Sequence, residues 1–333
     1  MDWNKGYSAI YYASFVDPST WRDIERFEIT GGSISRQDSD LMESADLDCV
    51  NYNQGERWVR VWMDTLQRGS SGHNALFTGL ACCPSEDIEG FRIDTQVQLY
   101  SVLKPADDVL LPRGWYAAAG VSGALIIRDL LSVSPAPVII DGEAPALAQA
   151  IIAEDTESRL TMAHKILDTI GWRFRISGMG EIHICPKASE VSARFDTLEN
   201  DSIEPKLSKK FDWFACPNVF RAVSDDLSAT VRDDDPDSPL STVSRGREIW
   251  KEETDCDLAE GESVADYAIR RLKEEQMVET SVSYDRRYHP DVLVSDWVYL
   301  NYPKQGIVGT FQVKNQSIEL GAGCPTSEDV VKV

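Results

Sequence analysis

The sequence predicts a β-rich α+β protein in which strand-rich regions near both ends flank small modules of helix and strand. Three observations support this class. Short apolar and aromatic runs alternate with turn residues through residues 1–110. A similar pattern returns after residue 210, and two segments carry apolar residues at helical spacing. Glycine clusters between the early runs favour antiparallel strands over parallel crossovers.

Residues 1–110 are expected to form an N-terminal domain of antiparallel strands. The four predicted strands cover residues 7–16, 57–63, 75–82 and 95–103, and the run 57–63 (RWVRVWM) is the clearest. Turns are expected at Gly31 with Gly32, at 53–55 and at 69–72. Because a lone two-stranded hairpin is marginal in water, closure into a small β-barrel is expected.

Residues 111–200 are expected to form an α+β module of a helix and a hairpin. Residues 114–131 fit either a helix or a strand pair, because their glycines weaken both. A helix is predicted from Thr156, as the N-cap, to Gly171, just beyond its end. Its apolar positions are Leu160, Ala163, Leu167 and Ile170. Two strands follow, at 172–176 and 182–184, joined by a turn at 178–180.

Residues 201–333 are expected to form a C-terminal β-barrel-like domain. A polar linker at 199–210, which contains Pro205, marks its start. A helix is predicted over 263–277, with Ser263 as its N-cap. Strands are predicted at 218–224, 229–232, 278–284, 297–302 and 310–320, and the segment after Gly321 is expected to fray.

The charge balance argues against tight nucleic-acid binding. There are 33 Lys and Arg against 55 Asp and Glu, a formal net charge of -22, which repels polyphosphate. Such a surface fits a wall that DNA passes without being held, although a merely solubilising surface has the same composition. No signal peptide and no apolar run long enough to span a bilayer is present, so the product is expected to be made and assembled in a cytosol.

No catalytic, cofactor-binding or metal-binding residue is predicted. The chain has no G-x-S-x-G motif, and His73, His164, His183 and His289 are too dispersed for a recognisable metal motif. Seven cysteines without a C-x-x-C pair favour free, mostly buried thiols over a structural zinc site. The acidic loop 233–237 fits a solvated loop better than a calcium site, because it lacks the EF-hand glycine and distal glutamate.

The sequence resembles the baseplate or tail hub proteins of tailed phages, prophages and contractile injection systems. The resemblance covers residues 155–320 through short motifs that occur in order along the chain. These are Leu167–Trp172 (LDTIGW), 217–220 (PNVF), 235–241 (DPDSPLS), 245–247 (RGR), 265–272 with its terminal RRL, 289–290 (HP), 296–300 (DWVYL), 302–303 (YP) and 309–313 (GTFQV). Over the first 150 residues the resemblance rests only on the β-rich pattern and on residues 31–35 (GGSIS).

The resemblance implies two tube-like antiparallel β-barrels with intervening small α+β modules, assembled as a homotrimer. Such a trimer adapts a sixfold tail tube to a threefold spike or fibre and surrounds the channel for genome passage. The implied partners are the tail tube or distal tail protein, a separate spike, tip or fibre protein, and the tape-measure protein, while DNA passes without specific binding. A virion tail protein, assembled in the host bacterial cytoplasm and not an enzyme, is therefore expected.

Two alternatives remain open. A receptor- or carbohydrate-binding module of the tail would use exposed aromatics such as Trp58 and Trp62 to stack on sugars. A peptidoglycan hydrolase is the less favoured alternative, because the chain shows no motif for it.

Overall fold

The computed structural model describes residues 2–3, 5–50, 52, 55–90, 92–197, 203–211, 213–214, 216–224, 227–254, 256, 263–276 and 280–333. Strands dominate it, which confirms the predicted β-rich class. The chain divides into two compact units. The large unit comprises Met1–Leu207, Ser283–Val331 and Val333, and the small unit comprises Ser208–Val282 with Lys332.

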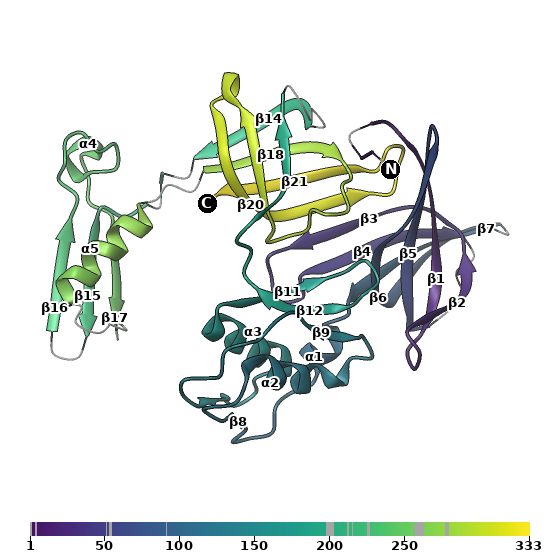
Figure 1. Cartoon of the computed structure of the whole chain (residues 1–333), viewed down its shortest axis with the longest axis horizontal. Coiled ribbons are helices and arrows are strands. Elements are labelled where there is room, and N and C mark those ends of the chain that lie inside the picture. The colour runs from purple at the N-terminus through teal and green to yellow at the C-terminus, as the bar shows by residue number, and fades with distance from the viewer. Residues whose placement is uncertain are drawn as a thin grey trace. The chain divides into compact units, whose positions relative to one another are not determined.

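One thirteen-stranded sheet is the framework of the large unit (Figure 1). Its strands are β1 (Ser8–Asp17), β2 (Arg22–Phe27), β3 (Ile29–Gln37), β4 (Glu43–Val50), β5 (Arg57–Gln67), β6 (Ser70–Glu89), β7 (Arg92–Ser101), β13 (Val191–Asp196), β14 (Ile203–Phe211), β18 (Thr280–Arg287), β19 (Trp297–Tyr302), β20 (Ile307–Glu319) and β21 (Pro325–Lys332).

The order of these strands joins distant parts of the sequence. It runs β14-β18-β21-β20-β3-β4-β7-β6-β5-β1-β2, with β19 beside β20 and β13 beside β19. The two sequence ends meet where β20 pairs antiparallel with β3, Asn315 lying opposite Gln37. Strands from both predicted strand-rich regions therefore share one continuous sheet. The described pairings form an open path, so closure of either region into a barrel stays a prediction.

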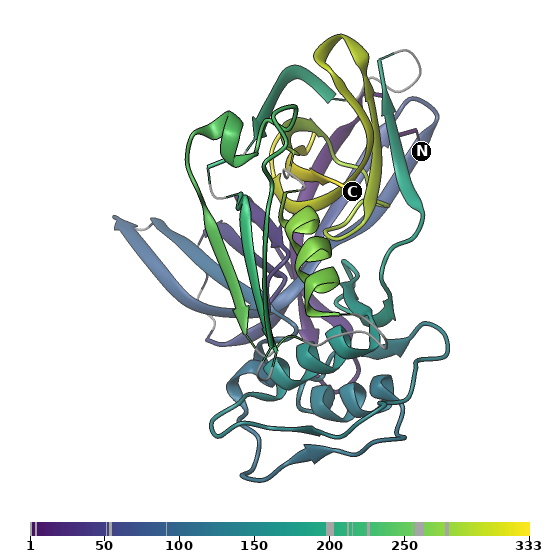
Figure 2. The same cartoon turned by 90° about the vertical axis from the view of Figure 1, so that its left-hand side faces the viewer.

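The early strands follow the predicted alternation. The runs at 7–16, 57–63, 75–82 and 95–103 correspond to β1, β5, β6 and β7. Inside this curved sheet, Val59, Val61 and Met63 of β5 are fully buried, because alternate residues of a strand face the same side. The β6–β7 hairpin projects beyond the rest of the unit, and residues 85–90 at its end are exposed (Figure 2).

The turn predicted at Gly31 and Gly32 is wrong, because both glycines lie inside β3. The strand pairing shifts register between Ile29 and Gly31. Gly32 has φ +137°, and a Cβ there would lie 2.3 Å from the backbone oxygen of Asp46. These glycines therefore permit a bulge and a close strand approach instead of a turn. Of the turn predicted at 53–55, residues 53 and 54 lie outside the described residues.

The α+β module lies beside the sheet at one end of the large unit (Figures 1 and 2). Its helices and strands are α1 (Lys104–Asp108), β8 (Tyr116–Ala117), α2 (Gly123–Leu130), the 3-10 turn η1 (Leu131–Val133), β9 (Val138–Ile140), β10 (Ile151–Ile152), α3 (Arg159–Ile170), β11 (Trp172–Ile176) and β12 (Ile182–Pro186). The predicted helix and hairpin are confirmed as α3, β11 and β12, and β9 adds a parallel third strand.

Two local details of the module differ from the prediction. The N-cap of α3 is Ser158, whose side chain accepts a hydrogen bond from the Thr161 backbone nitrogen, and not Thr156. Thr156 has φ 72° and belongs to the preceding turn. Of the two alternatives for residues 114–131, the helix forms as α2, whereas the short strand β8 pairs with β10 outside this segment. Gly171 ends α3 in the left-handed conformation, as predicted.

The small unit is a three-stranded sheet covered on one face by a helix. It contains β15 (Val219–Ser224), β16 (Leu227–Arg232), α4 (Thr242–Arg245), β17 (Trp250–Thr254) and α5 (Val264–Glu275). Ser263 caps α5 as predicted, but the helix ends at Glu275, and residue 277 of the predicted span lies outside the described residues. Tyr267, Ala268 and Leu272 of α5 pack on Phe220 and Ala222 of β15.

Two predictions for the C-terminal half are wrong. The segment 199–210 is not simply a linker, because residues 203–211 form β14, which ends the sheet path. An edge strand tolerates Pro205 because one of its sides needs no hydrogen-bond donors. The segment after Gly321 does not fray, since Pro325–Lys332 forms β21 between β18 and β20. The buried face of β21 carries polar Thr326 and Glu328 as well as apolar Val330, so the sequence lacks the usual alternation of apolar and polar residues.

The η2 turn (Pro303–Gln305) completes the elements. Of the six cysteines with described side chains, five are buried, and Cys49, Cys185, Cys256 and Cys324 are free thiols, in line with the prediction. Among the helices of the described residues, none has the length and apolar character that a membrane crossing requires.

Candidate functional site

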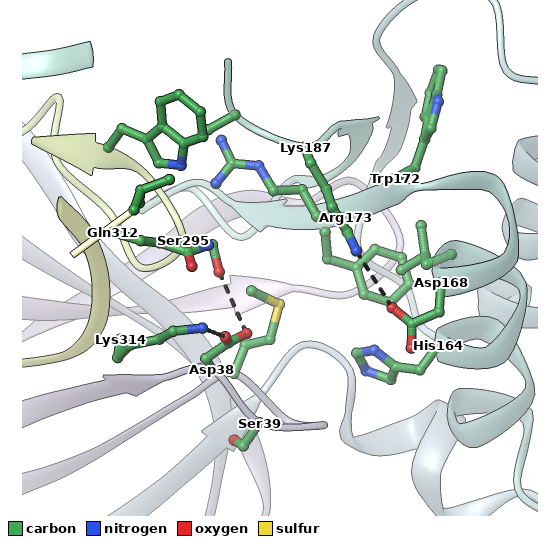
Figure 3. Close-up of a pocket in the computed structure, with 16 residues that line it drawn as sticks. Asp38, Ser39, His164, Asp168, Trp172, Arg173, Lys187, Ser295, Gln312 and Lys314 are labelled. Carbon is green, nitrogen blue, oxygen red and sulfur yellow. Dashed lines mark hydrogen bonds and ion pairs between the residues drawn. The ribbon is translucent and has the colours of Figure 1, made fainter. Parts of the chain in front are cut away.

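A pocket of about 430 Å³ lies within the large unit where three parts of the chain meet (Figure 3). Asp38, Ser39 and Met42 come from the β3–β4 connection. The α+β module contributes α3 and β11, and the C-terminal strands contribute a third wall. The module and C-terminal side chains labelled in Figure 3 are His164, Asp168, Trp172, Arg173, Lys187, Ser295, Gln312 and Lys314.

The local sequence explains how the module presents its side chains. In β11 Trp172, Phe174 and Ile176 are buried, so the intervening Arg173 and Arg175 face the opposite side of the strand. The Ser158 cap and the Gly171 end fix the length of α3, which sets His164 and Asp168 on neighbouring turns at the pocket.

Charged groups of both signs line the pocket. The ammonium of Lys314 lies 2.9 Å from Asp38 Oδ2, and that of Lys187 lies 3.9 Å from Asp168 Oδ1. Both pairs are partly exposed, so each contributes little to stability. The pocket lining therefore carries two partly exposed ion pairs, whose charged groups a ligand could engage in place of their present partners.

A more buried ion pair adjoins the pocket. Arg173 Nη2 donates to Asp296 Oδ1 at 2.8 Å, and Arg175 Nη2 lies 3.8 Å from the other oxygen of Asp296. The Asp296 side chain is only 2% exposed, and it also accepts the backbone N–H of Leu293 at 3.0 Å. One carboxylate thus faces two guanidinium groups. Arg173 Nε and Nη1 are buried without a hydrogen-bond partner.

The serine and the histidine of the pocket bond to different partners. Ser295 Oγ donates to Asp38 Oδ1 at 3.4 Å, while His164 Nε2 donates to the backbone oxygen of Asp40 at 2.9 Å. The His164 ring also makes an edge contact with Phe174. A base must lie within hydrogen-bond reach of its nucleophile, and no contact described here joins His164 to Ser295.

The other histidines make separate local contacts. His183 lies 2.8 Å from Asp141 Oδ2, and His73 lies 2.6 Å from Asp64 Oδ1. Burial lowers the pKa of His289. Within the described part of the chain, no cluster of three His, Cys, Asp or Glu side chains is arranged to hold a metal ion.

The acidic loop 233–237 is organised by its own hydrogen bonds. Asp233 Oδ2 accepts from Ser238 Oγ at 2.7 Å and from Gln276 Nε2 at 2.9 Å. Asp235 Oδ1 accepts the backbone N–H of Asp237 at 2.9 Å. These carboxylates therefore stabilise a turn and connect it to the end of α5.

The aromatic residues considered for sugar stacking are engaged within the protein. Trp58 makes an edge contact with Trp21 and packs against the core of the α+β module. Trp62 stacks on His73 with ring centroids 4.2 Å apart, and its indole nitrogen donates to Asp23 Oδ2 at 2.8 Å. One face of Trp62 is therefore covered by His73, which reduces the surface left for a sugar.

A buried polar network joins the two ends of the sequence. Arg36 of β3 donates from Nε to Glu43 Oε2 at 3.3 Å and from Nη1 to Gln316 Oε1 at 2.9 Å. Gln316 Nε2 then donates to Glu328 Oε1 at 2.7 Å, and Arg286 Nε donates to Glu328 Oε2 at 2.9 Å. No motif in the sequence marks this network, because its members are far apart in the chain.

Burial acts differently on the two acids of the network. Burial raises the pKa of Glu43 to about 7, against the opposing charge of Arg36, and its Oε1 has no hydrogen-bond partner. Burial also raises the pKa of Glu328, but the charge and hydrogen bonds of Arg286 outweigh it and hold this pKa below its usual value. Glu328 is thus the well-paired member and Glu43 the poorly paired one.

Comparison with known proteins gives matches in structure only. No family model matches the sequence, and no curated protein matches it. A 43 kDa tail protein of prophage MuSo2 from Shewanella oneidensis is 14% identical and has a TM-score of 0.67, with 98% of each chain covered. A tail protein from Neisseria meningitidis MC58 is 13% identical, with 98% of this chain and 97% of that chain covered and a TM-score of 0.66.

A third solved structure, a chain of a PdpA–VgrG complex from Francisella, is 8% identical with a TM-score of 0.60. The match covers 98% of this chain and 58% of that chain. At these identities the likeness concerns the fold. The chain therefore has the fold of phage-type tail proteins, which confirms at the level of the fold the resemblance seen in its sequence motifs.

Proposed function

We propose that this chain is a structural protein of a phage-type tail, and within it the hub of the tail tip or baseplate. The observation that carries the proposal is the match along the whole length of two tail proteins, with 98% of this chain covered in each. Such coverage includes the sheet, the α+β module and the small unit together. It therefore supports an equivalent whole protein rather than one shared module.

In this proposal three copies form a ring that adapts a sixfold tail tube to a threefold spike or fibre. Two barrel-like regions in each chain would supply six similar faces, from domains at 1–110 and 201–333 with the module 111–200 between them. The ring would surround the channel for genome passage. The net charge of -22 supports a channel wall that does not hold DNA.

The proposed partners are neighbouring proteins of the same tail: the tail tube or distal tail protein, a spike, tip or fibre protein, and the tape-measure protein. The likeness to a chain of the PdpA–VgrG complex supports a place within a multiprotein assembly. The protein would reside in the virion tail after assembly in the host bacterial cytoplasm.

A structural role without enzymatic activity fits the observed chemistry. Two of the solved structures that resemble the chain are described as tail proteins, and in the pocket His164 is bonded to the Asp40 backbone oxygen and Ser295 to Asp38. Glycan binding is the second candidate, but Trp58 and Trp62 both make contacts within the protein.

The mass of the purified protein in solution tests the hub proposal. Native mass spectrometry across a concentration series should find a species of about three times the 37.2 kDa of one chain. A stable dimer or tetramer would contradict the threefold ring. A monomer at every concentration, together with binding to a glycan array, would move the assignment to the carbohydrate-binding alternative.

A further inference from the structure

The pocket of Figure 3 differs in charge from the chain as a whole. Asp and Glu outnumber Lys and Arg by 55 to 33 in the sequence. Among the charged residues that line the pocket the order is reversed, with Arg173, Lys187 and Lys314 against Asp38 and Asp168. Arg173 is also paired with Asp296, which in turn faces Arg175, so four cationic and three anionic side chains surround the recess. This small excess of positive charge favours a ligand of negative charge.

The guanidinium of Arg173 has unused hydrogen-bonding capacity. Its side chain is 15% exposed and makes an ion pair through Nη2 with Asp296, while Nε and Nη1 have no partner. A buried charged donor without an acceptor is costly, so an arriving acceptor would be stabilised. Both nitrogens are shielded from water, so a ligand reaches them only when the guanidinium rotates about its ion pair with Asp296.

Apolar groups beside these cations complete the recess. Trp297, Met42 and Leu167 line the same cavity. A small inorganic anion would leave these surfaces uncovered, whereas a peptide with an acidic and an apolar side chain would use both kinds of contact. The aspartates of the lining, Asp38 and Asp168, disfavour a polyphosphate chain, which would bring several negative charges close to them.

We propose that this pocket binds an acidic side chain presented by a partner protein. The carboxylate pairs with Arg173 and is flanked by the ammonium of Lys314, and an adjoining apolar side chain packs on Trp297. The proposal rests on the proposed tail function only for the identity of the partner, a neighbouring tail protein. The recognition itself follows from the pocket and is measurable with a synthetic peptide.

Isothermal titration calorimetry of the full chain with three capped hexapeptides tests the proposal. One peptide alternates glutamate and leucine, and the others replace glutamate with glutamine or lysine. The glutamate peptide should bind. Its affinity should fall about tenfold in Arg173→Gln, which loses the more buried ion pair with the peptide, and about threefold in Lys314→Gln, which loses the more exposed one. Lys304→Gln, an exposed cation outside the pocket, should change affinity less than about twofold.

Several outcomes would overturn the proposal. These are a wild-type protein that binds none of the peptides at about 1 mM, equal binding of the glutamate and glutamine peptides, or pocket variants that bind as well as wild type. An oligothymidylate that binds more tightly than the glutamate peptide would instead identify a phosphate site. Unchanged thermal unfolding of Lys314→Gln separates loss of binding from loss of fold. The trimer mass is an independent readout, so failure of the hub proposal and failure of this one are distinguishable.

Discussion

Replacement of Glu328 by glutamine should destabilise the large unit severely. The side chains of Glu328 and Arg286 are both 0% exposed and are joined by two hydrogen bonds, one of them 2.9 Å from Arg286 Nε to Glu328 Oε2. Glutamine has nearly the same shape but no charge. The variant would therefore leave the Arg286 guanidinium buried without its counter-charge.

The expected loss is about 3 to 5 kcal/mol in the free energy of unfolding, the range found when one partner of a buried pair is removed. Exposed pairs give a matched control: Asp94→Asn removes the partner of Arg92, whose side chain is 64% exposed, and should cost less than about 1 kcal/mol. A double variant, Arg286→Met with Glu328→Leu, should recover most of the loss because it removes both charges.

Urea unfolding followed by tryptophan fluorescence is a suitable assay, since seven of the nine tryptophans lie in the large unit. The pKa of Glu328 lies below its usual value, so its stabilising contribution is present above pH 4.5 and is lost as the pH falls through the folded-state value. A loss below about 1 kcal/mol at pH 7, or a double variant as unstable as the single one, would refute the reasoning.

Three further perturbations address other parts of the fold. Because the pKa of Glu43 is raised from 4.5 to about 7, its contribution is complete below pH 4.5 and is lost as the pH rises through 7. Between pH 4.5 and 8 the free energy of unfolding of Glu43→Gln, measured with urea, should therefore rise by up to about 3 kcal/mol relative to that of wild type. A difference between the two proteins that does not change with pH would contradict this. Gly178→Ala would place a Cβ 1.9 Å from the Ala75 oxygen and should lower the thermal midpoint by several degrees, whereas Gly6→Ala meets nothing within 4 Å and should not. Ser263→Ala removes the cap of α5 and should speed amide hydrogen exchange in the small unit, lowering the free energy of protection by about 1 kcal/mol. Equal exchange rates in the variant and wild type would contradict this.

The predictions that succeeded rest on local patterns. The helix α3 and the hairpin after it followed from apolar residues at helical spacing and then from Trp172 and Phe174 alternating with arginines. The cap at Ser263 followed from its position before an amphipathic segment. In each case the deciding contacts lie within a few residues, so the sequence contains them.

The predictions that failed depend on distant contacts. The strand β21 is hidden in the sequence because Glu328 faces the interior, where Arg286 and Gln316 from other strands bond to it. The strand β14 contains Pro205, which an edge position tolerates. A period-2 pattern of apolar residues cannot reveal a buried face that is partly polar.

The pocket could not be predicted for the same reason. Asp38, Arg173 and Lys314 belong to three segments more than a hundred residues apart, and none stands in a motif. In the sequence, Arg173 is one of the polar residues that alternate with apolar residues in the predicted strand 172–176. Its pairing with Asp296, 123 residues away, depends on the placement of distant strands.

The pairing of β3 with β20 delays completion of the sheet until late in translation. Arg36 and Gln316 are 280 residues apart, so β3 leaves the ribosome long before its second neighbour exists. Until then the strand has an unpaired edge, which is a template for wrong pairing with other chains. The strands of the small unit are close together in sequence, and its segment 208–282 is translated before β20 appears. We therefore expect the nascent chain to depend on chaperones for most of its translation, and high contact order to make the last strands rate-limiting for folding.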